Sequence, residues 1–570
     1  MDHIKLLNQV RDKQNIELAF NYALNDRKLS DSYFDHFEIE YVNSFKEKVI
    51  EGIRGELQSL STLHTQAAYA YYMPKTNLCY RRMIYLPFKD LVIRYAFVII
   101  LTNHLDITLS SRCFANRKAS GKRANSFLLE DYYNVSHPNF RNWQKKCKDK
   151  YQVLIRTDIS AFYDSISHDY LIQTIAEQLS ISVETDFLKL LSKLLCPYVI
   201  SYSNKTKKLQ NALKLHQGLT IGNNLEGFLA NLYLRDVDEA MEDINIEYGR
   251  YNDDMRIFAT NREAAHSYLL ILQENLLNKG LNLNTAKTLI AENREEIENL
   301  RTKSFYEPSP GLYDTSLEIA DTKDANLVDQ GKANQIEEHI DKDSSLKELL
   351  KEFNPEEDIK NDKDAKNFCK YIQNYVELTE RIPKHIEKLE TVLTRYQGSS
   401  KHATWLLVQS TYYNDIPDET QTKAYEVLFN LFKHKNVLSY TKYRLIHHLV
   451  NNRQDKDKNQ YRLISRLNSQ YQEELKVNLK QLLKEPAFEL NIVALYALNK
   501  LGLELNELKK NIQKYIPKPV GDPIISAIFY LEEVKKSDDS NKENDKGLPS
   551  EEQQQEDMDY HQFEGKEEFY

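Results

Sequence analysis

Residues 248–259 read YGRYNDDMRIFA, which predicts two short strands joined by a tight turn at Asn252 and Asp253. The turn and the strand after it carry two adjacent carboxylates, Asp253 and Asp254. Neighbouring carboxylates repel each other, and a divalent cation relieves that repulsion. Adjacent acids are also common in surface turns, so this stretch indicates a metal site only in combination with other residues.

A second acidic stretch lies upstream, where residues 154–164 read LIRTDISAFYD. Its apolar start predicts a strand that ends at Asp158, and a helix-like segment follows. Nucleotidyl transfer requires carboxylates that hold two magnesium ions roughly 3.5–4 Å apart, one activating the attacking 3′-hydroxyl and one steadying the leaving pyrophosphate. Magnesium prefers oxygen ligands, so Asp158 is a candidate third carboxylate. The alternative is that Asp158 caps a helix or a turn.

Two further stretches bear glycine and lysine. Residues 216–224 read HQGLTIGNN and run into an apolar segment that predicts a helix. Gly218 would let the backbone approach a ligand closely, and Gln217 could hydrogen-bond a base or a sugar. A loop that merely caps a core helix is the alternative. Residues 280–288 read GLNLNTAKT in a strand-like run, and Lys287 either neutralises charge on pyrophosphate or is a surface lysine.

The order of these stretches along the chain is more specific than any one of them. Asp-x4-Tyr-Asp comes first, then Gln-Gly before a helix, then Tyr-x-Asp-Asp between strands, then Gly-Leu-x-Leu-Asn-x-x-Lys-Thr. This succession resembles palm motifs A to D of the reverse transcriptase family. Upstream, residues 82–94 and then 109–117 resemble the fingers motif of that family, with its arginine, its proline and a long helix. The resemblance covers about residues 75–290.

The resemblance implies an α+β right-hand polymerase fold with fingers and palm. It also implies that two Mg²⁺ ions, with Mn²⁺ as an acceptable substitute, are bound by Asp158, Asp253 and Asp254. The implied partners are deoxynucleoside triphosphates (dNTPs) and nucleic acid, namely an RNA template or an associated noncoding RNA and a DNA product. The family therefore predicts an RNA-directed DNA polymerase, which is a nucleotidyltransferase.

The resemblance also implies a set of nucleotide-binding residues, which are Arg82, Tyr163, Gln217, Gly218 and Lys287. Tyr163, five residues after Asp158, matches the side chain beneath the incoming sugar, where an aromatic ring clashes with a 2′-hydroxyl and favours deoxynucleotides. Arg82 matches the fingers arginine that grips the triphosphate, because a planar guanidinium suits bidentate phosphate contacts. The neighbouring Arg81 stays open as an alternative.

The distribution of charge explains a net charge of −9, which is unusual for an enzyme that binds nucleic acid. Residues 537–570 hold 12 acidic and 3 basic residues, so this tail carries the whole excess. By contrast, residues 112–156 hold 11 basic and 3 acidic residues, a balance that suits a phosphate backbone. A solvated basic loop is the alternative interpretation of the basic stretch.

Composition and periodicity predict five segments along the chain. They are an N-terminal helical segment at 1–60, the fingers and palm at 61–314, a charged linker at 315–366, an all-α helical-repeat domain at 367–536 and an acidic disordered tail at 537–570. One of the longest apolar runs, residues 95–101, is far too short to cross a membrane, and no basic-then-apolar leader opens the chain. We therefore expect a cytoplasmic protein with no membrane partner.

The all-helical half that follows the palm resembles the layout of bacterial abortive-infection and defence-associated reverse transcriptases. This resemblance implies an antiphage role, a homo-oligomer, and DNA synthesis that is primed by a protein tyrosine or free of a template. Two alternatives stay open. One is a mobile-element or retron-like enzyme that copies a specific RNA, and the other is a non-catalytic RNA-binding scaffold on a polymerase fold.

Overall fold

The computed structural model describes residues 2–29, 34–59, 61–75, 79–201, 213–302, 354, 357–413, 415–450, 467 and 469–516. The chain forms two compact units. The first consists of residues 1–33, 38–71 and 82–313, and the second of residues 34–37, 72–81 and 314–570. The predicted linker at 315–366 lies largely outside the described residues, and the predicted tail at 537–570 lies wholly outside them.

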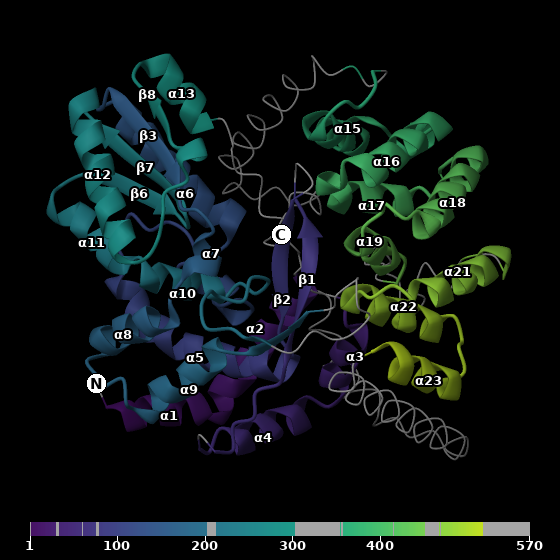
Figure 1. Cartoon of the computed structure of the whole chain (residues 1–570), viewed down its shortest axis with the longest axis horizontal. Helices are drawn as coiled ribbons and strands as arrows, with labels where there is room; N and C mark the ends of the chain where they lie inside the picture. The colour runs from purple at the N-terminus through teal and green to yellow at the C-terminus, as the bar shows by residue number, and fades with distance from the viewer. Residues whose placement is uncertain are drawn as a thin grey trace, which may run out of the picture. The chain divides into compact units, whose positions relative to one another are not determined.

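The N-terminal helices share one apolar core with the rest of the first unit. They are α1 His3–Arg11, α2 Lys13–Leu29, α3 His36–Ser44 and α4 Lys46–Glu56 (Figure 1). Most of their buried side chains, from Leu6 onward, belong to the same cluster as Ile155 and Ile257 of the motif-bearing strands. The predicted N-terminal helical segment therefore packs as part of the body that carries the motifs.

Helix α5 spans Phe88–Leu105, the long helix that the fingers motif predicts. Its side chains are buried almost all round, and Phe20 of α2 meets Phe88 edge-on with ring centroids 5.1 Å apart. Among the described helices, only the stretch Phe88–Thr108 is long and apolar enough to cross a membrane, and most of it is buried inside the protein. A helix that is apolar on every side suits the centre of a folded core.

One sheet has the strand order β2-β1-β4-β5. Its strands are β1 Ala68–Pro74, β2 Tyr80–Tyr85, β4 Tyr198–Ser201 and β5 Leu213–Lys214. Strands β1 and β4 run parallel, with Ala68 opposite Val199, although they lie far apart in the sequence. Strand β2 carries the predicted fingers arginine, Arg82.

The other sheet has the strand order β6-β7-β3-β8 and is antiparallel throughout. Its strands are β3 Val153–Asp158, β6 Glu247–Tyr251, β7 Asp254–Ala259 and β8 Leu289–Ala291. The connecting helices include α8 His168–Leu179 and α12 Arg262–Asn278, so the order along the chain is β-α-β-β-α-β. This topology makes β3 and β7, which come from the two acidic stretches, neighbours in the middle of the sheet (Figure 1).

Strand alternation gives this sheet two different faces. On one face Ile155 joins the main core, and on the other Leu154 and Phe258 join a second apolar cluster. Helices α6 His137–Lys148 and α13 Arg294–Thr302 supply half of the buried residues of that second cluster. Asp158 and Asp254 follow the same alternation as Leu154 and Phe258, so their side chains belong to the face that α6 and α13 cover.

The described residues of the second unit beyond residue 354 contain helices and no strand. The α-helices are α15 Asp362–Tyr375, α16 Pro383–Arg395, α17 Ser400–Gln409, α18 Asp418–Lys433, α19 Ser439–Val450, α21 Ser469–Leu482, α22 Phe488–Lys500 and α23 Leu505–Tyr515. Helix α15 ends at Tyr375, because the chain turns extended at Val376.

These helices pack in two alternating rows. In one row α16 packs on α18 and α18 on α21, and in the other α15 packs on α17, α17 on α19 and α19 on α22. Residues 34–37 join the same unit through aromatic contacts, since Phe34 meets Tyr443 and Phe488 edge-on with ring centroids 5.8 and 5.5 Å apart. Packing each helix against the next but one buries the apolar stripe of each between its neighbours.

Candidate active site

The register of the antiparallel sheet brings the predicted carboxylates together. Asp158, the last residue of β3, lies directly opposite Asp254, the first residue of β7. Opposite residues on antiparallel strands have Cα atoms about 4.5–5.5 Å apart. Asp253 lies beside them, in the two-residue turn between β6 and β7. Two separate stretches of sequence therefore bring their acidic residues to the same end of the sheet.

The turn that presents Asp253 is held by its neighbours. Asn252 has a φ of +56°, a left-handed conformation that asparagine tolerates better than most residues. Its side-chain oxygen accepts a hydrogen bond from Asn116 Nδ2. On the preceding strand, the buried Arg250 donates from Nε and from Nη2 to the carboxylate of Asp238, each at 2.8 Å. These contacts fix the hairpin that carries the candidate metal ligands.

Asp253 lies in a field that disfavours its charged form. Burial raises the pKa of Asp253 to about 7, and the carboxylates of Asp158 and Asp254 add to the shift, while Lys287 opposes it less strongly. A cation close to such a carboxyl group stabilises its charged form. The local electrostatics therefore favour a positively charged ligand at the turn.

Two arginines that the motifs do not mark as functional bind Asp254. Nη2 of Arg256 donates to Asp254 Oδ2 at 2.9 Å, its Nη1 donates to Oδ1, and Nε of Arg156 lies 3.5 Å from Oδ1. Burial alone would raise the pKa of Asp254, but the two guanidinium groups outweigh burial and the pKa is lowered. Each arginine lies two residues from an acid on the same strand, and the two arginines are opposite each other. The period-two alternation of strands is the sequence signal that could have found them.

Lys287 binds the other strand carboxylate. Its Nζ lies 2.9 Å from Asp158 Oδ2, and the backbone N–H of Asn284 donates to the carbonyl of Asp158 at 2.7 Å. Lys287 is the last residue of a 3₁₀ turn, Thr285–Lys287, and not part of a strand. The strand-like prediction for this lysine was therefore wrong. Leu283, before the turn, forms an isolated antiparallel bridge with Ile159, and the regular pairing of β8 with β3 begins at Leu289, after the turn.

The glycine-bearing loop lies against the segment that follows β3. Leu219 N–H donates to the carbonyl of Tyr163 at 2.8 Å. Gln217 Nε2 donates to the carbonyl of the next residue, Asp164, at 3.3 Å. Tyr163, which the family resemblance assigns to the sugar, is therefore a neighbour of Gln217 and Gly218 in space although not in sequence.

Gly218 fits this contact because it has no side chain. Its φ is +87°, and a Cβ atom there would lie 3.0 Å from both Cα and O of Asp164. We expect Gly218→Ala to lower the free energy of unfolding by about 2 kcal/mol or more, because left-handed strain adds to a clash with backbone atoms. Urea unfolding followed by circular dichroism measures this change.

Gly280 provides the matched control for that substitution. Its φ is +72°, yet no atom lies within 4 Å of the position that a Cβ would take. Gly280→Ala therefore introduces the backbone strain alone and is expected to cost about 1 kcal/mol. Equal losses for the two alanine variants would contradict the close approach of Gly218 to Asp164.

Arg82 lies on the side of β2 that faces these residues. Its Nη2 is 3.2 Å from Asp164 Oδ1 in an exposed ion pair. Arg81 points to the opposite side, because successive strand residues alternate. Ile84 N–H donates to the carbonyl of Ile221 at 2.9 Å, which holds β2 beside the glycine-bearing loop. Of the two neighbouring arginines, the structure thus brings Arg82 to the candidate site.

The donor set fits a divalent cation by its chemistry. Asp158, Asp253 and Asp254 offer carboxylate oxygens, which are the ligands that Mg²⁺ prefers. In the part of the chain that the structure describes, no group of three or more His, Cys, Asp or Glu side chains converges as a metal site. Lys287 and Arg256 engage two of the three carboxylates instead. A cation that binds here therefore competes with Lys287 for the oxygens of Asp158 and with Arg256 for the oxygens of Asp254.

Comparison with known proteins adds one finding to this geometry. Residues 82–303 match the family model described as reverse transcriptase (RNA-dependent DNA polymerase). The matched segment runs from β2 to the end of α13 and includes every predicted site residue. No curated protein matches the chain.

Proposed function

We propose, from the premise that residues 82–303 form a reverse transcriptase domain, that this chain is a Mg²⁺-dependent DNA polymerase. Such a domain is an RNA-directed DNA polymerase, a nucleotidyltransferase, and in general it binds nucleic acid, dNTPs and divalent metal ions. The observation that carries the proposal is the register that sets Asp158 opposite Asp254 and beside Asp253. A polymerase requires this convergence of acids from two motifs.

The three carboxylates are the proposed metal ligands. Two Mg²⁺ ions bound to them would activate the 3′-hydroxyl and stabilise charge on the leaving pyrophosphate. Asp254 is oriented for this task by its bonds to Arg256, which hold the carboxylate at the start of β7. Lys287 is within reach of the same carboxylates, because its ammonium group binds Asp158. When the ammonium group moves off Asp158, it neutralises charge on the leaving pyrophosphate.

The residues around the carboxylates position the nucleotide. We assign Arg82 to binding of the triphosphate. Its guanidinium group leaves the exposed carboxylate of Asp164 and binds phosphate oxygens instead. The ring of Tyr163 lies beneath the sugar and excludes a 2′-hydroxyl. Gln217 and Gly218 present a hydrogen-bonding side chain and a bare backbone to the nucleotide from the adjoining loop.

We further propose that the protein acts in antiphage defence, like bacterial abortive-infection reverse transcriptases. The two rows of helices in the second unit support a helical-repeat region that follows the polymerase domain in the sequence. By the same resemblance, the protein assembles as a homo-oligomer and starts DNA on a tyrosine of its own chain or without a template. A retron-like enzyme that copies one specific RNA is the competing assignment.

The activity is tested with purified protein, labelled dNTPs and Mg²⁺. We expect labelled DNA to form and EDTA to stop its formation, because the carboxylates act through bound metal. Reactions with and without added RNA, before and after ribonuclease treatment, separate templated from template-free synthesis. Label that stays on the protein in a denaturing gel indicates protein priming. No product under any of these conditions would refute the polymerase.

The biological role is tested in bacteria that express the chain and are challenged with phage. We expect fewer plaques with the wild type than with Asp253→Asn, because defence here depends on polymerisation. Equal protection by the two proteins would favour a non-catalytic scaffold. Sequencing the nucleic acid that co-purifies with the protein distinguishes the assignments, since a single recurrent structured RNA would identify the retron-like alternative.

A further inference from the structure

The basic residues of the stretch 112–156 divide into two groups in the structure, and all of them lie in the described range 79–201. Five are shielded from solvent to different degrees and form ion pairs inside the protein: Arg112, Arg117, Arg123, Lys148 and Arg156. Six are exposed and form no ion pair with any described residue: Lys118, Lys122, Arg141, Lys145, Lys146 and Lys150. The stretch as a whole is therefore not one phosphate-binding surface, and only the exposed group is available to a ligand.

Three of the exposed cations lie on α6, and one of them, Lys146, lines an open groove of about 480 Å³. The groove runs between α6 and the loop at residues 111–117. Its lining includes Arg112, Asn139, Asn142, Trp143 and Lys146, and no carboxylate of the described residues belongs to it. A groove of this size holds a small molecule or a few nucleotides, and its cations and amides suit phosphate and sugar oxygens.

The two walls of the groove are fixed to each other at one glutamate. Nη2 of Arg112, on the loop side, lies 2.9 Å from Glu247 Oε1, and Trp143 Nε1, on the α6 side, donates to the same oxygen at 2.7 Å. The indole ring packs on Gly249, where a Cβ atom would lie 2.7 Å from the ring. The negative charge of Glu247 is thus stabilised by Arg112 and Trp143 of the two walls. A groove held in this way exists before its ligand arrives, which lowers the ordering cost of binding.

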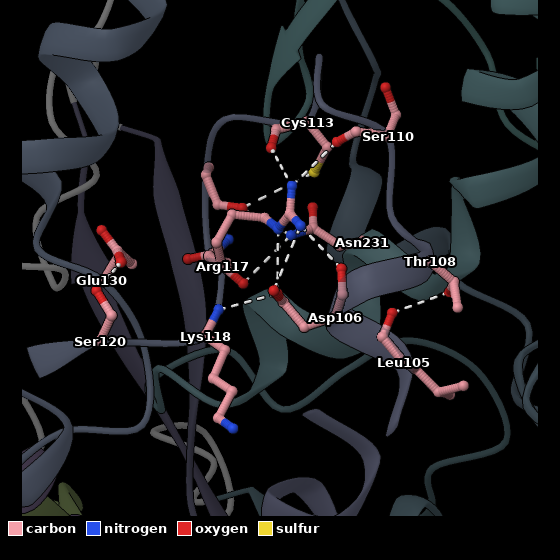
Figure 2. Close-up of polar contacts among 12 residues, drawn as sticks. Leu105, Asp106, Thr108, Ser110, Cys113, Arg117, Lys118, Ser120, Glu130 and Asn231 are labelled. Carbon is pink, nitrogen blue, oxygen red and sulfur yellow. Dashed lines mark hydrogen bonds and ion pairs between the residues drawn. The ribbon is translucent and has the colours of Figure 1, made fainter. Parts of the chain in front are cut away.

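The loop wall is stiffened by Arg117. Figure 2 shows its guanidinium between the carboxylate of Asp106 and the carbonyls of Ser110 and Cys113, with bonds of 3.1 Å to Asp106 Oδ1 and 3.0 Å to Ser110 O. The backbone N–H of Lys118 donates to the same carboxylate at 2.9 Å, while the Lys118 ammonium points away from these contacts (Figure 2). Arg117 therefore shapes the groove, and the exposed cations around it supply the charge.

The groove leads along β6 toward the carboxylates. Glu247 begins β6 and Tyr251 ends it, a length of about 13 Å at the usual rise per strand residue. The loop runs parallel to this strand, with Cys113 opposite Arg250, and reaches the metal-site turn where Asn116 bonds to Asn252. A strand of nucleic acid that leaves the carboxylates can therefore follow the loop into the groove.

We propose that the groove between α6 and the loop at 111–117 binds the sugar–phosphate backbone of a single nucleic-acid strand, at a site separate from the carboxylates. Lys146 provides a cation from the groove lining, Arg141 and Lys145 add positive charge on the same helix, and Asn139 and Asn142 provide neutral hydrogen bonds. The contacts are to the backbone, so binding does not depend on sequence. This inference rests on the proposed function only in taking the template or the product as the strand.

The test measures binding of fluorescent oligo(dT) to the full chain in EDTA, by anisotropy. An oligonucleotide of about 20 residues exceeds the roughly 4–16 nucleotides that one single-strand-binding domain covers. We expect the charge reversal Arg141→Glu/Lys145→Glu/Lys146→Glu to raise Kd about tenfold or more at physiological salt. The neutral triple variant with glutamine is expected to reduce the slope of log K against log salt by up to about 2, since each lost phosphate contact removes about 0.7.

A matched control carries the same change in net charge elsewhere. Lys5, Lys435 and Lys484 are exposed and form no ion pair with described residues, so their triple change to glutamate is expected to leave Kd close to that of the wild type. An equal rise in Kd for this control variant would show that binding depends only on net charge, and would overturn the proposed site. So would an unchanged salt slope in the glutamine variant, or equal competition by a duplex or by free dNTP.

The groove and the polymerase can fail separately. If the α6 variants bind oligo(dT) like the wild type while the wild type still incorporates dNTPs, the groove is refuted and the polymerase stands. If the wild type forms no product but the α6 variants lose binding in EDTA, the groove stands and the proposed function falls. Circular dichroism melting of each triple variant excludes loss of fold as the cause.

Discussion

Asp253→Asn is expected to abolish dNTP incorporation by the purified protein. We expect the rate to fall about 10³-fold, which corresponds to about 4 kcal/mol of transition-state stabilisation. Asparagine keeps the size of the side chain but removes the negative charge that binds a dication. Asp253 is also the carboxylate whose pKa is raised to about 7 by burial and by its acidic neighbours, so a cation has the most to relieve at this position. Incorporation of labelled dNTPs, with Mn²⁺ binding measured by paramagnetic resonance, gives two independent readouts.

The control for this substitution is an aspartate of the same chain outside the candidate site. Asp243 is exposed at the end of α11 (Arg235–Asp243), and Asp243→Asn is expected to leave both readouts unchanged. Asp254→Asn is a less clean test, because it leaves the buried Arg156 and Arg256 without their carboxylate and also costs stability. Retention of activity and of Mn²⁺ binding by Asp253→Asn would contradict a metal site at the turn.

Tyr163→Val is expected to admit ribonucleotides. The ratio of kcat/KM for a deoxynucleotide to that for the ribonucleotide with the same base should fall about 100-fold, a loss of about 2.7 kcal/mol of discrimination. The physical reason is steric, because valine removes the ring that would occupy the space of a 2′-hydroxyl. The Tyr163 carbonyl accepts a hydrogen bond from Leu219 N–H at 2.8 Å, which fixes its backbone, and its side chain packs on Phe162 with ring centroids 5.3 Å apart.

Tyr163→Phe separates the ring from its hydroxyl. Phenylalanine keeps the ring and is expected to keep the discrimination, while losing only the contacts of the phenolic oxygen. Steady-state incorporation of paired deoxy- and ribonucleotides measures both variants. If Tyr163→Val discriminates as well as the wild type, another residue excludes the 2′-hydroxyl. If Tyr163→Phe loses discrimination as fully as Tyr163→Val, a hydrogen bond and not a clash is responsible.

Most of the local structure around the candidate site was predictable from the sequence. The long helix after the fingers arginine runs from Phe88 to Leu105, as its apolar pattern predicts, and the acids lie at the strand ends and the turn where the motifs put them. These features depend on residues a few positions apart, through turn chemistry and strand or helix periodicity.

Partnerships between distant charges were not predictable. Nothing in the sequence distinguishes among the eleven basic residues at 112–156. The structure, however, pairs Arg112 with Glu247 and Lys148 with Glu298, and it leaves the exposed cations of α6 in contact with solvent. Ion pairs form between any opposite charges that folding brings within a few ångströms. A count along the chain therefore cannot tell a structural arginine from one that is available to bind a ligand.

The sequence by itself determined which acids are present, their order along the chain and the strand and turn that carry them, because these follow from short-range pattern. Only the tertiary structure decided that Asp158 lies opposite Asp254, that Arg156 and Arg256 hold Asp254, and that α6 covers the same face of the sheet. The reason is register: a shift of one residue between β3 and β7 would send one set of side chains to the opposite face. Packing of the whole first unit selects that register, and no local motif contains it.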